Sequence, residues 1–358
     1  MKLPSIQIGI HKAAEAIIQQ GMAFFISLAP LAAAVANRGG IGTIAASGMS
    51  AEELRREIKR AKELLILGCT GLLAVNIMGA VTNFYELLQV CIDEGIPIVF
   101  TGAGIPEAKM FELTKDTNTV VVPIVSSGGV VRVMAKKLKL PKPAAIVGEG
   151  DEAGGHIGKI GMNTRKLLDD LKKALEEVGW EDVPIIMAGT VQTAEDFAEM
   201  LGNGAAGCGV GTRFALTTEA REYLAPWQDV MLTTKPGDII IIGDKDPVTH
   251  KKRPGSPTGY PSRPRKNPLV DQLLANGFVP ITDPNWKCLK NTCLSHCIFR
   301  ESGHKESFCI NDALRKAFKG DFEHGLFFTG ARLCEITSII SVPDYFEEIE
   351  DGLEKIAA

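Results

Sequence analysis

Between residues 16 and 225 the sequence alternates eight times between a short apolar run and a longer amphipathic stretch. The apolar runs have the length and composition of buried strands, and Gly or Ser flanks each of them. In the stretch 51–67, Leu54, Ile58 and Leu65 recur at helical spacing while charged side chains fill the opposite face. We predict strands at residues 17–21, 41–46, 72–77, 97–101, 120–125, 144–148, 184–188 and 206–210, and helices at residues 31–37, 51–67, 83–94, 106–115, 130–138, 164–178, 194–201 and 218–224.

Apolar strands that alternate with one-sided helices are typical of a parallel sheet covered by helices, because both faces of such a sheet are buried. Eight such units within about 210 residues predict a closed (β/α)8 TIM barrel, which is an α/β fold. An open, doubly wound sheet is the alternative. The barrel would place all the loops that follow its strands at one face, which makes that face the expected active site.

The alternation ends near residue 226. Residues 235–268 contain seven prolines, and six Lys and Arg lie within residues 250–266. Such a run is usually a solvated loop; otherwise it would attract an acidic carrier protein or a nucleotide phosphate. We therefore divide the chain into a barrel, residues 1–226, and a C-terminal extension, residues 227–358, which carries this proline-rich arm and four clustered cysteines.

The net charge is -4 and the isoelectric point about 6.0, so no overall positive field favours nucleic acid or an anionic membrane. The most apolar segment, residues 21–36, is too short to span a bilayer and is interrupted by Ser27 and Pro30. The residues before it lack the compact basic region of an export signal. Together with eight cysteines, this favours a reducing, cytoplasmic compartment.

The loop after the sixth predicted strand, residues 147–158, is rich in glycine and carries Glu149, Asp151, Glu152 and His156. Imidazole titrates at about pH 6.5, so we expect His156 to exchange protons at neutral pH with little tuning. A lone histidine is usually structural or exposed. Its place on this loop nevertheless favours a catalytic role or a substrate contact.

The loops after the seventh and eighth predicted strands contain Gly189, Gly209, Gly211 and Thr212. Loops at these places commonly bind phosphate in such barrels, because backbone N–H groups and a helix N-terminus face the anion. These four residues are therefore candidate phosphate ligands. The alternative is that the glycines only allow tight turns.

Seven motifs along the barrel resemble one known family: QGMA at 20–23, LAAAVANRGGIGTIAASG at 31–48, VNIM at 75–78, GAGIP at 102–106, EGDEAGGHIG at 149–158, MAGTV at 187–191 and GVGTRF at 209–214. The chain is similar to the nitronate monooxygenase (2-nitropropane dioxygenase) family, which includes the FMN-dependent enoyl-acyl carrier protein reductases. The resemblance covers about residues 16–225. It implies a TIM barrel with FMN bound non-covalently at the carboxyl ends of the strands.

The resemblance also implies roles for single residues. Met22 and Ala23 would lie beside the isoalloxazine ring, Asn76 would contact the flavin, Ser126 and Glu149 would lie near it, Gly189, Thr190, Gly209, Gly211 and Thr212 would surround the phosphate, and His156 would be the active-site histidine. The chain departs from the family at Thr190, where a second glycine is common, and in its cysteine-bearing C-terminal extension.

Cys288, Cys293, Cys297 and Cys309 have the spacing C-x4-C-x3-C-x11-C. Four thiolates could hold a 4Fe-4S cluster or a zinc ion, and His296 or His304 could replace one of them. The spacing matches neither the paired CxxC pattern nor a ferredoxin run, so ordinary reduced cysteines are the alternative. The remaining cysteines, Cys69, Cys91, Cys208 and Cys334, are interpreted as small core residues.

The leading hypothesis is an FMN-dependent oxidoreductase of the nitronate monooxygenase type, which oxidises alkyl nitronates or a related small substrate with the help of His156. The first alternative is an NAD(P)H-dependent enoyl-acyl carrier protein reductase, whose partner would be an acyl carrier protein. An iron–sulfur cluster would favour an electron carrier as partner. A non-catalytic, redox-sensing or partner-binding scaffold is the alternative of another class. The sequence leaves the nicotinamide cofactor and the oligomeric state open.

Overall fold

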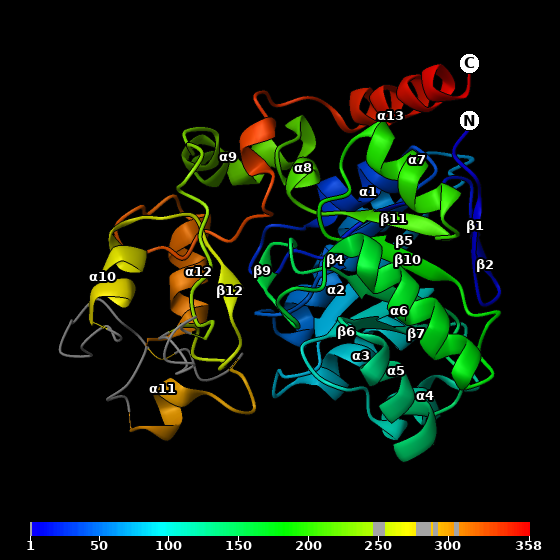
Figure 1. Cartoon of the computed structure of the whole chain (residues 1–358), viewed down its shortest axis with the longest axis horizontal. Coiled ribbons are helices and arrows are strands. Elements are labelled where there is room, and N and C mark those ends of the chain that lie inside the picture. The colour runs from blue at the N-terminus through cyan, green and yellow to red at the C-terminus, as the bar shows by residue number, and fades with distance from the viewer. Residues whose placement is uncertain (1, 246–254, 277–287, 289–292, 304–307) are drawn as a thin grey trace.

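Eight parallel strands form a closed barrel, which confirms the predicted TIM barrel and excludes the open sheet (Figure 1). The computed structural model describes residues 2–245, 255–276, 288, 293–303 and 308–358. All eight predicted strands are present, as β3 (Ile17–Gln19), β4 (Ile41–Ala45), β5 (Leu72–Met78), β6 (Ile98–Gly102), β7 (Val120–Val125), β8 (Ile146–Glu149), β10 (Ile185–Ala188) and β11 (Gly207–Val210). Each strand pairs with the next along the chain, and β11 closes the barrel on β3.

The helices that follow the strands surround the barrel. They are α1 (Ala29–Asn37), α2 (Ala51–Glu63), α3 (Phe84–Asp93), α4 (Ala108–Thr114), α5 (Gly128–Arg132) with a π-helical turn (Val133–Lys137), α6 (Thr164–Glu177), α7 (Ala194–Gly202), the short α8 (Thr212–Ala215) and α9 (Thr218–Leu232). The last of these extends past its predicted end at residue 224 and includes Pro226. The proposed boundary at residue 226 therefore lies within α9.

Local sequence explains why α2 begins and ends where it does. Ser50 and Glu53 form a capping box at its start, and Leu54 and Ile58 face the core. The helix ends four residues before its predicted end at 67. Asn37 bonds the Leu64 carbonyl and the Ile66 N–H, which draws the chain out of the helix.

The inside of the barrel is filled by apolar side chains, among them Ile18, Phe100 and Ile186. A short antiparallel hairpin, β1 (Ile6–Ile8) and β2 (His11–Ala13), closes the end of the barrel at which the strands begin, and Ile6 and Ile8 join this core. Among the described residues, the large cavity lies at the other end, where the strands finish.

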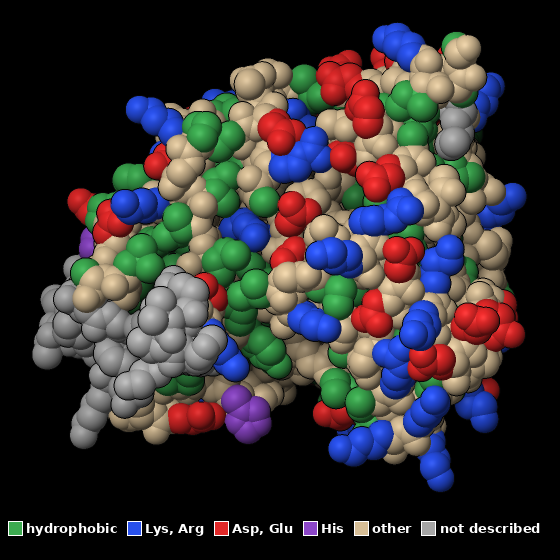
Figure 2. Space-filling model, in the orientation of Figure 1, with side chains coloured by type: hydrophobic (Ala, Val, Ile, Leu, Met, Phe, Trp, Pro, Cys, Tyr) green, Lys and Arg blue, Asp and Glu red, His purple; other side chains and the backbone are tan. Residues whose placement is uncertain are grey.

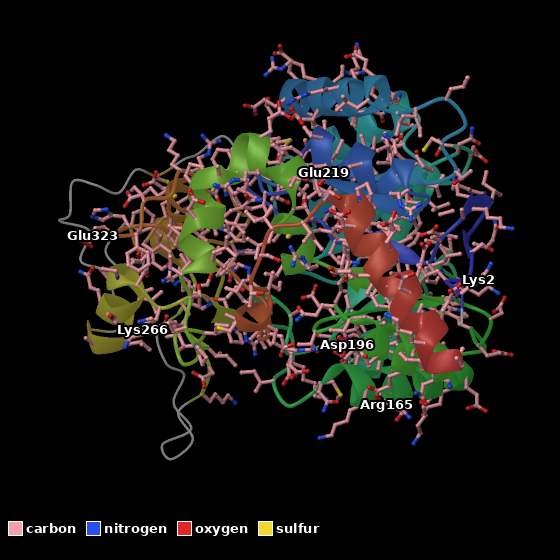
Figure 3. The ribbon with its side chains drawn as sticks, turned by 90° about the horizontal axis from the view of Figure 1, so that it is seen from above. Lys2, Arg165, Asp196, Glu219, Lys266 and Glu323 are labelled. Atoms are coloured by element: carbon pink, nitrogen blue, oxygen red, sulfur yellow. The ribbon has the colours of Figure 1, made fainter. Side chains whose placement is uncertain are left out.

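The C-terminal extension lies beside that open end and then returns to the barrel (Figure 1). Its elements are β12 (Ser262–Arg263), which pairs with the small strand β9 (Gly155–His156), α10 (Pro268–Asn276), α11 (Ile298–Glu301), α12 (Ile310–Phe318), a 3-10 turn (Leu333–Glu335) and α13 (Val342–Ala357). Figure 3 shows α13 lying across the barrel helices, with Glu219 at its start. Both carboxylate oxygens of Glu219 accept from the Val342 N–H at 3.0 Å, and Arg332 pairs with Asp196 at 2.7 Å.

The prediction of a solvated basic arm is wrong for the part of it that the structure describes; residues 250–254 lie outside the described residues. Arg263 and Arg265 are buried, at 7% exposure each. Arg263 donates to the carbonyls of Asp151 and Ala153, and Arg265 donates to that of Val230. These two guanidinium groups hold backbone carbonyls and do not face an acidic partner.

Charges of both signs are mixed over the barrel helices on the face shown in Figure 2. The apolar segment 21–36 forms the loop after β3 and most of α1. In the described part of the chain, no helix has both the length and the apolar character needed to cross a membrane.

Candidate functional site

One large cavity, of about 500 Å³, lies at the open end of the barrel. Residues that follow each of the eight strands contribute to its wall, and the C-terminal extension supplies the rest. Every candidate site residue of the barrel lines this cavity: Met22, Ala23, Asn76, Ser126, Glu149, His156, Gly189, Thr190, Gly209, Gly211 and Thr212. Asp151 and Glu152 do not; Asp151 accepts from the Gly161 N–H, and Glu152 accepts from the Thr190 hydroxyl.

Two glycines let polar side chains reach the cavity. A Cβ at Gly21 would lie 2.2 Å from the Asn76 Cβ, so only glycine lets the end of β3 pass the side chain of Asn76. A Cβ at Gly158 would lie 2.2 Å from the Ser126 Oγ. Asn76 and Ser126 therefore share the cavity wall because neighbouring backbone lacks side chains.

Gln20, which the sequence did not single out as a ligand, has a buried amide Nε2 without a hydrogen-bond partner in the described structure. A Cβ at Gly209 would lie 2.3 Å from this nitrogen, so the amide sits directly over the bare backbone of β11. Buried polar atoms are nearly always satisfied in folded proteins. A donor left open at a cavity wall indicates that a ligand completes it.

The loops after β10 and β11 lie next to each other at the same wall. Gly189 has a φ of 97° and packs against the backbone of Gly150. Thr190 also has a positive φ, 58°, at the position where the family commonly has a second glycine. Its hydroxyl, which donates to Glu152 at 2.9 Å, holds it in this unfavourable conformation. The hydroxyl oxygen of Thr212 accepts from the Gly330 N–H, which joins the extension to this loop.

His156 lies on β9, beside the cavity, with its ring edge-on to Phe328 at a centroid distance of 5.2 Å. Burial lowers the pKa of His156 from 6.5 to about 4. The expectation that it titrates near neutrality is therefore wrong. At neutral pH the imidazole is uncharged, so one ring nitrogen can accept a proton, while the N–H of the other is too weak an acid to give its proton up.

Burial moves Glu149 in the opposite direction. The carboxyl group of this residue, at the end of β8, has a pKa raised from 4.5 to about 7, because its charged form loses hydration. The cavity thus holds one group that is an uncharged base and one that keeps its proton up to neutral pH. Two groups whose pKa values are shifted apart by their surroundings are typical of an acid and a base in one active site.

We expect the Glu149→Gln variant to remove a pH-dependent part of the stability. Between about pH 4.5 and pH 7 the glutamate ionises in the unfolded chain but stays protonated in the folded protein. The difference in unfolding free energy, wild type minus variant, should therefore be greatest below pH 4.5 and fall as the pH rises through 7. Urea unfolding of both cofactor-free proteins across this pH range measures the difference in unfolding free energy. A difference that does not change with pH would contradict the raised pKa of Glu149.

The C-terminal extension covers the cavity with apolar side chains that were not among the predicted site residues: Leu294, Ile310, Leu314, Leu326 and Phe328. Leu294 is held there by a bridge to Val81 and by a bond between the Ser295 N–H and the Ala80 carbonyl, 2.7 Å long. Ile310 and Leu314 are one helical turn apart on the amphipathic helix α12, so their apolar face is visible in the sequence. Leu294, Leu326 and Phe328 lie outside the helices, where no periodicity marks a buried face.

The predicted metal site is not confirmed. Within the described part of the chain, no three His, Cys, Asp or Glu side chains are arranged to hold a metal ion. Cys293, Cys297 and Cys309 are buried among apolar side chains between the barrel and the extension, and burial raises the pKa of Cys293. His296 is exposed and pairs with Glu301, whereas His304 lies outside the described residues. Of the other cysteines, Cys91 and Cys208 are core residues as predicted, but Cys69 and Cys334 are only half-buried.

The cavity lies at the end of the closed barrel where barrel enzymes have their active sites. The sequence model of the family described as nitronate monooxygenase matches residues 5–66 and 69–351. The chain therefore belongs to the nitronate monooxygenase family. The match continues past the barrel, so it includes most of the C-terminal extension.

Three proteins similar to this chain have different names. A (3aS,4S,5R,7aS)-5-hydroxy-7a-methyl-1-oxo-octahydro-1H-indene-4-carboxyl-CoA dehydrogenase of Mycobacterium tuberculosis is 29% identical over 225 residues, which are 61% of this chain and 59% of the dehydrogenase. A probable nitronate monooxygenase of Staphylococcus saprophyticus is 27% identical over 62% of this chain and 70% of its own length. The structure of FabK from Thermotoga maritima superposes with a TM-score of 0.75 and 25% identity, over 96% of this chain and 94% of FabK.

Proposed function

We propose that this protein is an FMN-dependent oxidoreductase that oxidises an alkyl nitronate, formed inside the site from an uncharged nitroalkane or a related small carbon acid. The observation that carries this proposal is His156, an uncharged base that faces a cavity with open cofactor contacts. A carbon acid must lose a proton before it can give up an electron pair, and an uncharged imidazole has a ring nitrogen free to accept that proton.

The residues of the cavity fit FMN. The open amide of Gln20 provides a donor for a flavin ring, and Asn76 lies within the same wall. The bare backbone at Gly189, Gly209 and Gly211, followed by the first turn of α8, provides N–H groups for a phosphate. Bound FMN would supply the redox chemistry, taking electrons from the substrate and passing them to oxygen.

The charges of the wall favour a substrate that enters uncharged. No lysine is among the described lining residues, and both arginines there already donate to protein oxygens. Arg213 donates to the Ser338 carbonyl, and Arg332 pairs with Asp196. When His156 takes a proton from a neutral nitroalkane, the imidazolium formed beside the nitronate balances its charge, so the site needs no further cation.

A second candidate, an NAD(P)H-dependent enoyl thioester reductase, is favoured by two other features. Glu149 keeps a proton up to about pH 7 and could deliver it to a carbon atom. The apolar cover formed by Leu294, Leu314 and Phe328 suits an acyl chain. Under this candidate an acyl carrier protein is the partner.

Two measurements on the flavin-loaded protein separate the candidates. We expect oxygen consumption on addition of a nitroalkane or its nitronate, and no loss of flavin absorbance on anaerobic mixing with NADH or NADPH. Rapid bleaching by either nicotinamide, followed by recovery with a short enoyl thioester, would replace the first candidate with the second. Absence of turnover with all of these substrates would favour the non-catalytic scaffold.

A further inference from the structure

The proline-rich arm places the hydroxyl group of Ser256 beside His156. Ser256 is buried, at 4% exposure, and its Oγ lies 2.7 Å from the Nε2 of His156. The two residues are 100 positions apart, and nothing in the sequence connects them. This contact is the only hydrogen bond that the imidazole makes with a described residue, so the orientation of the ring depends on it.

A second hydroxyl fixes Ser256. The Oγ of Ser256 lies 3.0 Å from the Oγ1 of Thr258, and the Thr258 N–H donates to the Ser256 Oγ at 3.3 Å. The Tyr260 N–H donates in turn to the Thr258 Oγ1 at 3.2 Å. Backbone donors thus occupy one acceptor position on each hydroxyl and restrict how the pair can rotate.

The backbone of the arm is joined to the backbone of the histidine loop, so the hydroxyl and the ring keep their relative positions. Ser262 of β12 pairs with His156 of β9, and the Ile157 N–H donates to the Pro261 carbonyl at 2.8 Å. On the other side of the histidine, the buried guanidinium of Arg263 holds the carbonyls of Asp151 and Ala153, at 2.7 and 2.9 Å. The arm therefore acts as an added strand that braces the loop.

We propose that Ser256 is a positioning residue, which holds His156 as the tautomer with a proton on Nε2 and leaves Nδ1 as the basic atom of the site. In this arrangement the Nε2–H donates to the Ser256 Oγ, whose own hydrogen goes to the Thr258 Oγ1. Nδ1 makes no hydrogen bond to a described residue and is the ring nitrogen left for a substrate proton. The choice of tautomer rests on the proposed function, in which the imidazole is a base. The hydrogen bond between Ser256 and His156 does not depend on that function.

Nitrogen-15 NMR of protein labelled at histidine tests the tautomer without any substrate. We expect the Nδ1 of His156 to show the shift of an unprotonated ring nitrogen and Nε2 that of a protonated one. In Ser256→Ala both shifts should move toward the average of a mixture, while His11, whose Nε2 contacts the Asn118 carbonyl on the far end of the barrel, should not change. A protonated Nδ1 in the wild type, or unchanged His156 shifts in the variant, overturns the proposal.

Thr258 provides a matched pair of variants that does not depend on the folding of Ser256→Ala. Thr258→Val removes the second hydroxyl at nearly constant size and should move the His156 shifts in the same direction, whereas Thr258→Ser keeps the hydroxyl and should restore them. Equal spectra for the valine and serine variants would show that the hydroxyl pair does not hold the ring.

Kinetics then connect the tautomer with the reaction. For the flavin-loaded Ser256→Ala variant we expect kcat for the nitroalkane to fall about tenfold, the effect of one lost hydrogen bond to the reacting group, with KM nearly unchanged. A rise in KM at constant kcat contradicts a positioning role. If the NMR result holds but neither protein turns over a nitroalkane, the proposed function has failed and the structural inference stands.

Discussion

Replacing His156 with glutamine should lower kcat/KM for a neutral nitroalkane by about 10²–10⁴-fold, the usual contribution of a general base. Glutamine places an amide nitrogen close to the position of Nε2, so the contact with Ser256 can persist, but it cannot accept a proton at neutral pH. The wild-type imidazole stays uncharged above about pH 4, so it remains competent across the neutral range.

The same variant should oxidise a preformed nitronate at nearly the wild-type rate, because that substrate has already lost its proton. Equal losses for the nitroalkane and the nitronate would contradict the role of base and indicate that His156 only shapes the cavity. FMN content should be unchanged. His11→Gln, at the closed end of the barrel, is the matched control and should leave both activities intact.

Replacing Gly209 with alanine should weaken FMN binding by about 10–100-fold, the effect of one or two displaced polar contacts. The added methyl group would lie 2.3 Å from the Nε2 of Gln20 and 3.0 Å from the Cβ of Ala188. The end of the Gln20 side chain can move aside, so the barrel should still fold. The Gln20 Nε2 would then no longer lie at the cavity wall, where it is proposed to bind the flavin. Flavin fluorescence titration of the cofactor-free protein measures the affinity.

Two further variants assign the loss to that donor. Gln20→Leu should weaken FMN binding to a similar degree, and combining it with Gly209→Ala should add little, because both changes remove one contact. Gly202→Ala, at the end of α7 where a Cβ meets nothing within 4 Å, should bind FMN as the wild type does. Additive losses in the double variant would mean that Gln20 and Gly209 act on the cofactor separately.

The barrel could be predicted from the sequence because its signal is local and repeated. Each strand is a short apolar run, each helix has one apolar face, and eight repetitions of this unit have few arrangements in which all of them are covered. The positions that line the cavity follow from the same rule, since residues such as Asn76, Glu149 and Gly209 stand where strands end. Single elements still differ: α9 continues through Pro226, and α2 ends early because Asn37 competes for its last backbone groups.

What could not be predicted depends on contacts between distant parts of the chain. The composition of the arm predicted a solvated basic loop. Arg263 is buried instead, because its guanidinium donates to the carbonyls of Asp151 and Ala153, which are distant in the sequence. The low pKa of His156 arises from burial that includes the aromatic ring of Phe328, which lies 172 positions away in the chain. The spacing of cysteines suggested a metal, but among the described residues no three ligating side chains are arranged to hold one.

The cover of the cavity is fastened on both sides. It leaves the barrel after α9, and it returns where Glu219 holds the start of α13 and Arg332 grips Asp196. These contacts fix the end of the cover to the barrel, and its apolar side chains pack in one core with residues of the barrel helices. Substitutions in the cover that change which substrate fits should therefore also lower the thermal stability of the protein. New specificities should arise together with stabilising substitutions elsewhere in the chain.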